Sequence, residues 1–203
     1  MNKTLIVAVS ALMLAASAAV AQTEISLTSS YEVPLGELKW IYQPGMSYAL
    51  NVGRVKETRV SRSTTGIEVG YLRFQPKDSV FYYLLSEEEY GTIRYSNYQA
   101  IQLSLTLRHD FFLNDRVSLF VGAGVGYYYT FFTYLDDNSF VNTDAQVIEG
   151  RAGISPRVGV NVLLSESVGL LVQSKYNASI GQPDISSLYN HYLSSGLGVF
   201  VRF

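Results

Sequence analysis

The sequence predicts an all-β chain folded as an eight-stranded, antiparallel, up-and-down barrel. The main observation is a strict alternation of apolar and polar residues, which places the two kinds of side chain on opposite faces of a strand. The alternation is clearest over 101–108, where every odd position is aliphatic and every even position is polar. The second observation is a repeated hairpin, because short polar connections near 56–59, 113–116 and 164–167 alternate with long ones.

The residues before the first strand predict an export signal. A short positive start is followed by an uncharged, mostly apolar run. The run ends in Ala19-Val20-Ala21, the small-x-small pattern of a signal-peptidase site, which predicts cleavage before Gln22. A retained membrane helix is the alternative, but the end of the run is rich in Ala and Ser, which favours cleavage. We therefore expect a signal peptide over 1–21 and one barrel domain over 22–203.

The alternation accounts for the strands in order. After Gln22 no stretch approaches the roughly 18 uninterrupted apolar residues that a membrane-spanning helix needs. Eight strands are expected near 24–32, 46–52, 67–71, 101–108, 117–131, 154–162, 168–176 and 193–203. Long connections are expected near 33–45, 75–97, 132–148 and 178–191. An even number of strands joined in this way places both chain ends on the side of the short turns.

The composition of the polar face of the strands indicates which face of the barrel meets lipid. Opposite the aliphatic face, the predicted strands carry Gly, Ser, Asn, Gln and charged residues, with a few aromatics such as Phe120, Tyr128 and Phe200. Such a face cannot build the apolar core of a soluble barrel, but it suits the crowded polar interior of a small closed one. The aliphatic face then meets lipid, with Tyr and Phe at the strand ends as interfacial girdles. The sequence therefore predicts a transmembrane β-barrel, which closes because lipid offers no partner to an open edge.

The predicted inward face carries charged residues, which are Glu68, Arg108, Asp110, Arg157, Lys175 and Arg202. The first interpretation is an ion-pair network that fills the lumen, since buried charges need partners. The alternative is the lining of a narrow pore, which four cations against two anions would make mildly anion-preferring. Because Glu68 and Arg157 fall at a similar depth, we expect them to interact across the lumen.

The run 122–126, Gly-Ala-Gly-Val-Gly, suggests at first a phosphate-binding loop. Its glycines alternate within a strand pattern and no helix follows them, so the helix terminus that would bind a phosphate is missing. We expect instead that these glycines leave room for bulky side chains in a narrow lumen.

Several classes of chemistry lack support in the sequence. A chain without Cys has no disulfide framework, Cys-based zinc site or thiol nucleophile, and a net charge of −2 argues against nucleic-acid binding. His191 and Ser194 should point to opposite faces of a strand, and no acidic residue follows to orient the base of a Ser hydrolase. The acidic residues of 87–89 and 136–137 lack the spacing of a calcium loop. No catalytic, cofactor-binding or metal-binding residues are therefore expected.

Further features are the signal segment, the strands over 48–53 and 67–74, the run 117–126 and the terminal Phe203. Together they resemble the small eight-stranded outer-membrane β-barrel proteins, the porin-like and outer-membrane-protein-A-like group. The resemblance covers about 24–203. It implies a place in the outer membrane of a Gram-negative bacterium with both termini periplasmic.

The resemblance also implies partners and a role. In that group a C-terminal aromatic is part of the signal read by the barrel-assembly machinery, and Val199, Val201 and Phe203 match that pattern. Periplasmic chaperones during biogenesis and contact with outer-membrane lipid and lipopolysaccharide are expected as well. The expected role is non-enzymatic, either structural or surface interaction through extracellular loops. A small passive pore for small solutes is the alternative, because this fold serves many functions.

Overall fold

The computed structural model describes residues 22–84, 90–137, 142–179 and 191–203. The predicted signal over 1–21, the acidic residues of 87–89 and most of the expected connection 178–191 lie outside the described residues. No helix among the described residues is long and apolar enough to cross a membrane.

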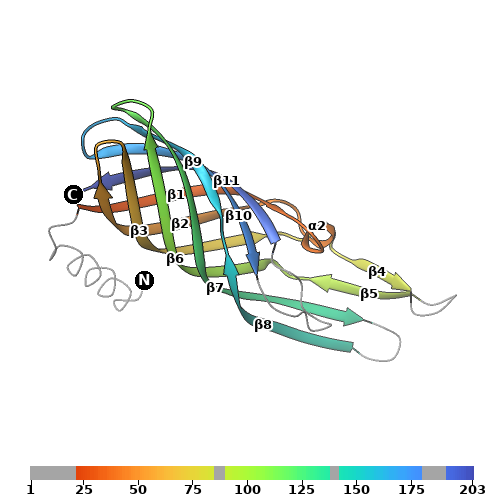
Figure 1. Ribbon diagram of the computed structural model, residues 1–203. Helices are drawn as coiled ribbons and strands as arrows, with labels where there is room; N and C mark the ends of the chain where they lie inside the picture. The colour runs from red at the N-terminus through yellow and green to blue at the C-terminus, as the bar shows by residue number, and fades with distance from the viewer. Residues whose placement is uncertain (1–21, 85–89, 138–141, 180–190) are drawn as a thin grey trace.

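The strand pairings form a ring of eight antiparallel strands (Figure 1). In ring order the strands are β1 (Gln22–Pro34), β2 (Gly45–Glu57), β3 (Ser61–Phe74), β6 (Tyr98–Phe112), β7 (Val117–Asp137), β8 (Asn142–Ile154) with β9 (Arg157–Leu163), β10 (Val168–Ser179) and β11 (His191–Arg202). The last strand returns to the first, because β11 pairs with β1 along its whole length, from Glu24 opposite Arg202 to Pro34 opposite Tyr192. The predicted all-β, antiparallel, eight-stranded arrangement is confirmed.

The strands β8 and β9 act as one strand of the ring. They are separated by Ser155 and Pro156, yet both keep the same register with β7 and with β10. Ser155 exchanges both of its backbone hydrogen bonds with Gly124, at 3.0 and 2.8 Å. Proline has no N–H to donate, so the hydrogen-bond ladder is interrupted at Pro156, while the chain keeps its position between β7 and β10.

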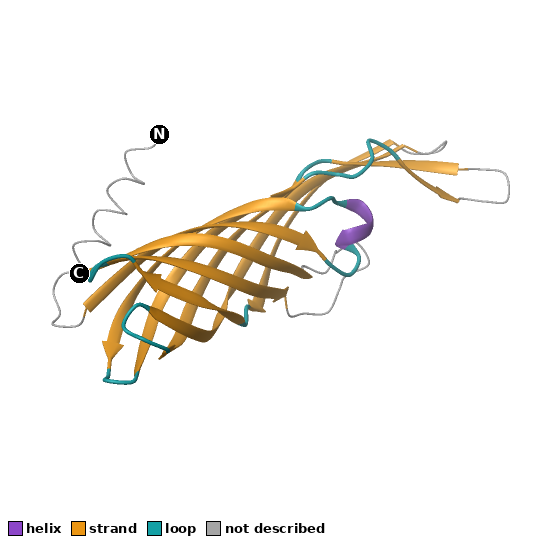
Figure 2. Ribbon diagram, turned by 90° about the horizontal axis from the view of Figure 1, so that it is seen from above, coloured by secondary structure: helices purple, strands orange, loops and turns teal. Residues whose placement is uncertain are grey.

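The three short connections lie at one end of the ring, called here the turn end, as predicted. The turns between the paired strands are residues 58–60, 113–116 and 164–167. The Asn114 side chain fixes the middle turn by accepting the backbone N–H groups of Arg116 and Val117 at 2.9 and 2.8 Å. The C-terminus lies at this end as well (Figure 2), where Thr23 and Phe203 exchange backbone hydrogen bonds of 3.1 and 2.9 Å.

At the opposite, loop end the prediction of plain connections over 75–97 and 132–148 was wrong. The first contains two strands, β4 (Phe81–Leu84) and β5 (Tyr90–Tyr95), and the second is largely taken up by β7 and β8. Because β5 pairs with β7, these four strands form a small sheet that projects beyond the ring (Figures 1 and 2). Aromatic residues such as those of β4 favour strands when they can pack across one.

The connection between β1 and β2 folds onto the loop end. It contains one turn of helix, α2 (Leu38–Ile41), and its residue Tyr42 bridges to Pro76 in the connection after β3. Leu38 and Tyr42 are fully buried there. Together with residues from the strand ends they form an apolar cluster, the aromatic cap, made of Leu38, Tyr42, Leu72, Phe74, Tyr98, Ala100, Tyr128, Phe132 and Tyr192.

Below the cap the ring is polar inside and apolar outside. Aliphatic side chains such as Leu105 and Leu197 are 68% and 66% exposed, whereas Asp110 and Ser194 are fully buried. This is the inverse of a soluble barrel, and it matches the faces that the sequence alternation predicts.

Candidate functional site

The middle of the lumen is crossed by one carboxylate and two cations, called here the central triad. Glu68 extends from β3, and Arg157 and Lys175 extend from β9 and β10 on the far side of the ring. Arg157 donates from Nη1 and Nη2 to the two carboxylate oxygens at 2.5 and 3.1 Å, and Lys175 Nζ lies 3.2 Å from Oε1. All three side chains are 6% exposed or less. The structure thus brings Glu68 and Arg157 together across the lumen, as the sequence analysis expected, and adds Lys175.

The glycines of β7 make space for this triad. A Cβ on Gly124 would lie 3.1 Å from Arg157 Nη2, and a Cβ on Gly122 would lie 3.2 Å from Arg157 Cγ. Ser155, opposite Gly124, accepts a further hydrogen bond from Arg157 Nη2 at 3.3 Å. The glycine run therefore lies beside a bulky lumen side chain, as expected, and no helix follows it.

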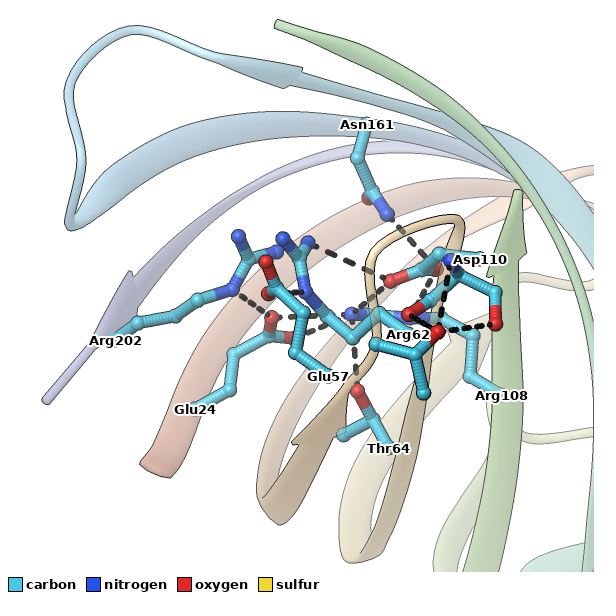
Figure 3. Close-up of polar contacts among 10 residues, drawn as sticks. Glu24, Glu57, Arg62, Thr64, Arg108, Asp110, Asn161 and Arg202 are labelled. Carbon is cyan, nitrogen blue, oxygen red and sulfur yellow. Dashed lines mark hydrogen bonds and ion pairs between the residues drawn. The ribbon is translucent and has the colours of Figure 1, made fainter. Parts of the chain in front are cut away.

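A second group of charges, called here the turn-end network, fills the other end of the lumen (Figure 3). Its centre is Glu24, whose carboxylate lies 2.8 Å from Arg108 Nη2 and 2.8 Å from Arg202 Nε. Arg108 Nε also lies 2.9 Å from Asp110, which accepts a hydrogen bond from Asn161 at 3.1 Å. Each carboxylate therefore meets a cation, which is the condition for burying charge at moderate cost.

Arg62 extends the network toward the mouth of the barrel. Its Nε lies 2.7 Å from Glu57, and its Nη1 lies 3.7 Å from Asp110. The Arg62 guanidinium also lies over the ring of Phe112, 5.0 Å from its centre. Glu57, with a side chain 43% exposed, is the member that borders solvent.

Sequence reasoning missed part of this site. It did not single out Glu24, Glu32, Glu57 or Arg62, all of which point inward in the structure. The alternation of Glu24, Ser26, Thr28, Ser30 and Glu32 was the signal for the first two. The other two lie beyond the ends of the strands expected near 46–52 and 67–71, because the real strands are longer.

The missed residues correct the predicted charge balance. The sequence analysis counted four cations against two anions on the inward face. Below the aromatic cap, the described residues instead place five cations with five carboxylates: Arg62, Arg108, Arg157, Lys175 and Arg202 with Glu24, Glu32, Glu57, Glu68 and Asp110. An evenly balanced lumen gives no electrostatic preference for anions, so the anion-preferring lining was wrong in its premise.

A layer of hydrogen bonds around the Glu32 carboxylate separates the central triad from the aromatic cap. Ser47 and Ser194 both donate to the Glu32 carboxylate, and Asn177 donates to Ser194 Oγ at 2.8 Å. Asn177 in turn accepts from the Tyr128 hydroxyl at 3.4 Å. Because Tyr128 also belongs to the aromatic cap, the polar and apolar fillings meet at this residue.

The space left inside is small. A cavity of about 30 Å³ lies between the turn-end network and the central triad, bordered by Thr64, Arg108 and Glu68. Another of about 10 Å³ lies above the triad, bordered by Glu32, Lys175 and Tyr192. The first has room for about one or two water molecules, and the second for at most about one. A wider opening, of about 380 Å³, is a vestibule at the turn end that is bordered by Arg62.

The pair of His191 and Ser194 is not arranged as a base beside a nucleophile. His191 Nδ1 lies 2.9 Å from the Tyr176 hydroxyl on the outward side, whereas Ser194 is fully buried against Glu32. They lie on opposite faces, as the sequence predicts. His109 Nδ1 lies 2.9 Å from Ser63. In the described parts of the chain, no group of three or more His, Cys, Asp or Glu side chains is placed to hold a metal ion.

The remaining predicted residues lie at the chain ends. Ala19 and Ala21 fall outside the described residues, and Gln22 begins β1. Val199, Val201 and Phe203 share the outward side at the end of β11, where Phe203 is 73% exposed.

Comparisons with known proteins agree with the fold and do not assign a family. No family model matches the sequence, and no curated protein matches it. Solved structures do match. Neisserial surface protein A is 15% identical, with a TM-score of 0.55 over 89% of this chain and 97% of that one. A major outer membrane protein of Thermus thermophilus is 13% identical, with a TM-score of 0.55 over 91% of this chain and 100% of that one.

The N-terminal β-barrel domain of Pseudomonas aeruginosa OprF gives the same result. It is 13% identical, with a TM-score of 0.50 over 90% of this chain and 98% of that one. Sequence identities this low indicate a shared fold and do not indicate a shared function. The chain therefore has the fold of the small outer-membrane β-barrel proteins.

Proposed function

We propose that the chain is a closed, non-conducting barrel of the outer membrane whose role is structural or surface interaction, not catalysis. The signal over 1–21 exports it, and Val199, Val201 and Phe203 present the outward pattern that the barrel-assembly machinery reads. Both termini then lie in the periplasm, the loop end lies outside the cell, and the aliphatic exterior meets lipid. The fold shared with outer-membrane proteins supports this placement.

The filled lumen is the observation that carries the proposal. Three successive fillings occupy it, which are the turn-end network, the central triad and the aromatic cap. An eight-stranded barrel leaves an interior just wide enough for side chains, and here those side chains pair with one another. The cavities of about 30 and 10 Å³ between the fillings are too small for a solute path. These features support a plug over the alternative of a passive pore.

The sheet that projects from the loop end is the candidate interaction surface. Its strands β4 and β5 expose Tyr82, Leu84 and Tyr90 at 74%, 62% and 65%. Exposed aromatic and aliphatic side chains on one sheet are typical of protein-binding surfaces. A barrel that anchors such a sheet needs no open lumen, so the filled interior and the projecting sheet support the same role.

Single-channel conductance of the refolded barrel in a planar bilayer tests the proposal. We expect no steady current from samples whose folded state is established by heat-dependent gel mobility and circular dichroism. A steady, reproducible current from such samples would instead establish the pore and make Arg157 and Lys175 the first residues to substitute.

A further inference from the structure

The outward face carries a shallow groove that the proposed function does not use. Its volume is about 680 Å³, and it crosses β9, β10, β11 and β1 to reach the first residues of β2. These strands lie side by side in the ring (Figure 1). Its outward-facing lining consists of serine, valine, leucine, tyrosine and methionine side chains, which are Ser29, Tyr31, Met46, Val158, Val160, Val172, Ser174, Ser195 and Leu197.

Strand register shows that the groove follows one row of the sheet, that is, a line of residues that lie opposite one another on neighbouring strands. Val158 lies opposite Ser174, Ser174 opposite Ser195, Ser195 opposite Tyr31, and Tyr31 opposite Met46. Met46 in turn lies opposite Arg73 on β3. Since neighbouring strands lie about 4.8 Å apart, Arg73 follows directly where the groove ends.

The row is inclined, with Arg73 at its loop end. Arg73 is one residue from the loop end of β3, whereas Ser174 is five residues from the loop end of β10. An inclination of this kind follows from the strand tilt of about 35–45° in a membrane barrel. In the proposed membrane, Arg73 therefore lies at headgroup level, and the groove descends from it into the hydrocarbon.

Arg73 is a cation without an anion. It is exposed on the outward face, and none of the ion pairs among the described residues includes it. Its neighbours in the row are Met46 and Gln99, and Tyr71 precedes it on the same face. A guanidinium in this position binds phosphate oxygens well, because its planar fork matches them.

We propose that this face is a binding site for an anionic, phosphate-bearing membrane lipid of the outer leaflet. The phosphate lies against Arg73, and one acyl chain lies along the groove from Met46 toward Val158. Charge complementarity at Arg73 and the apolar hollow that starts beside it together select this occupant over an uncharged lipid. The proposal rests on the membrane insertion proposed above and names a lipid partner for that barrel.

Lipid retention measured by native mass spectrometry tests the site. The full-length barrel is refolded into nanodiscs of phosphatidylcholine with a minority of phosphatidic acid, and the lipids that stay bound after release are counted. The variants are Arg73→Gln, which removes the cation, and Ser195→Leu, which fills the groove. Their matched controls are Arg54→Gln and Thr65→Leu, two exposed outward positions away from the groove.

We expect the unmodified chain to retain phosphatidic acid in preference to phosphatidylcholine. Arg73→Gln should lower that retention about fivefold, the effect of one cation near a membrane surface. Ser195→Leu should lower it as well, because the larger side chain fills the groove. The two controls should retain as much as the unmodified chain, and excess inorganic phosphate should displace little, because the acyl chain is part of the ligand.

Other outcomes overturn the site. Equal losses in Arg73→Gln and Arg54→Gln would indicate general charge attraction, and full retention in Ser195→Leu would exclude the groove. Displacement by inorganic phosphate would indicate a site for a free anion. Gel mobility and conductance on the same samples separate this test from the proposed function. A folded, non-conducting barrel without lipid preference overturns the lipid site alone.

Discussion

Replacing Glu68 by Gln is the sharpest test of how the lumen is held. The substitution keeps the size of the side chain but removes the charge that faces Arg157 at 2.5 Å and Lys175 at 3.2 Å. Each cation is 6% exposed, so neither gains much water in exchange. Removing one partner of a buried ion pair leaves an uncompensated buried charge, which costs about 3–5 kcal/mol. We expect the free energy of unfolding to fall by that amount.

Urea unfolding in lipid vesicles, followed by circular dichroism, measures the change. Fluorescence is less suitable, because the single tryptophan, Trp40, is 70% exposed on α2 and far from the triad along the barrel. Glu57→Gln is the matched control. Its side chain is 43% exposed and pairs with Arg62, so its loss should cost less than about 1 kcal/mol.

A triple variant separates charge pairing from packing. In Glu68→Leu with Arg157→Met and Lys175→Met, the three charges of the central triad are removed together, and Glu32 keeps its hydrogen bonds from two serine hydroxyls. Replacing a buried ion pair by apolar residues of similar volume is often neutral or stabilising, so the triple variant should recover most of the stability that Glu68→Gln loses. If the triple variant were as unstable as the single one, or if Glu57→Gln cost as much as Glu68→Gln, the ion-pair reasoning would be refuted.

Other substitutions test the aromatic cap and the lumen packing. Leu38→Ala should lower the free energy of unfolding by about 2–5 kcal/mol, measured by urea titration, because a fully buried leucine is truncated. Tyr42→Phe should be neutral or stabilising at neutral pH, since the buried Tyr42 hydroxyl has no hydrogen-bond partner among the described residues. Burial, with a smaller contribution from Tyr95, also raises the pKa of Tyr42, so the native state favours the neutral phenol. Stability should therefore fall as the pH rises above the ordinary tyrosine pKa of about 10, less so in Tyr42→Phe, which alkaline unfolding curves measure. Gly169→Ala should destabilise the barrel, measured by its gel-mobility transition temperature, because the new methyl group would meet the Phe200 ring; Gly36→Ala, a control for the glycine position, should lose only the strain of its φ of 58°.

The ring could be predicted from the sequence because each strand lies between two environments. Over 101–108 of β6, apolar and polar positions alternate without exception, and the structure exposes the first set and turns the second inward. The three turns followed from the same pattern. Six of the inward charges followed too, since alternation assigns a face to each residue of a strand once its boundaries are right.

The projecting sheet could not be predicted in the same way. Its strands carry aromatic residues on both faces, as in Phe81-Tyr82-Tyr83-Leu84, so they show no period of two. Their formation depends on contacts distant in sequence, such as the pairing of Tyr95 with Tyr134 and the hydrogen bond from Tyr83 to Asp136 at 2.7 Å. Aromatic strands of this kind are stabilised by tertiary packing, which local pattern does not contain.

The ion-pair partners show a similar limit. Glu24 and Arg202 lie at opposite ends of the described chain, and they meet because β1 pairs with β11. Sequence spacing gives the face and the approximate depth of each charge, but the partner depends on how the ring is staggered. The depth of Glu68 and Arg157 was enough to expect their contact, whereas the position of Lys175 opposite the same carboxylate required the ring.

The charges of the lumen balance level by level, which is what a filled interior of this kind requires. At the turn end, Arg62, Arg108 and Arg202 face Glu24, Glu57 and Asp110. In the middle, Arg157 and Lys175 face Glu68, and the Glu32 carboxylate borders the same cavity as Lys175. Neutral levels avoid the cost of isolated charge inside a lipid-facing wall, and they hold cations and anions to each other instead of to passing ions. A path through the barrel would have to break these pairs and also unpack the aromatic cap, so the surfaces open to partners are the projecting sheet and the outer wall.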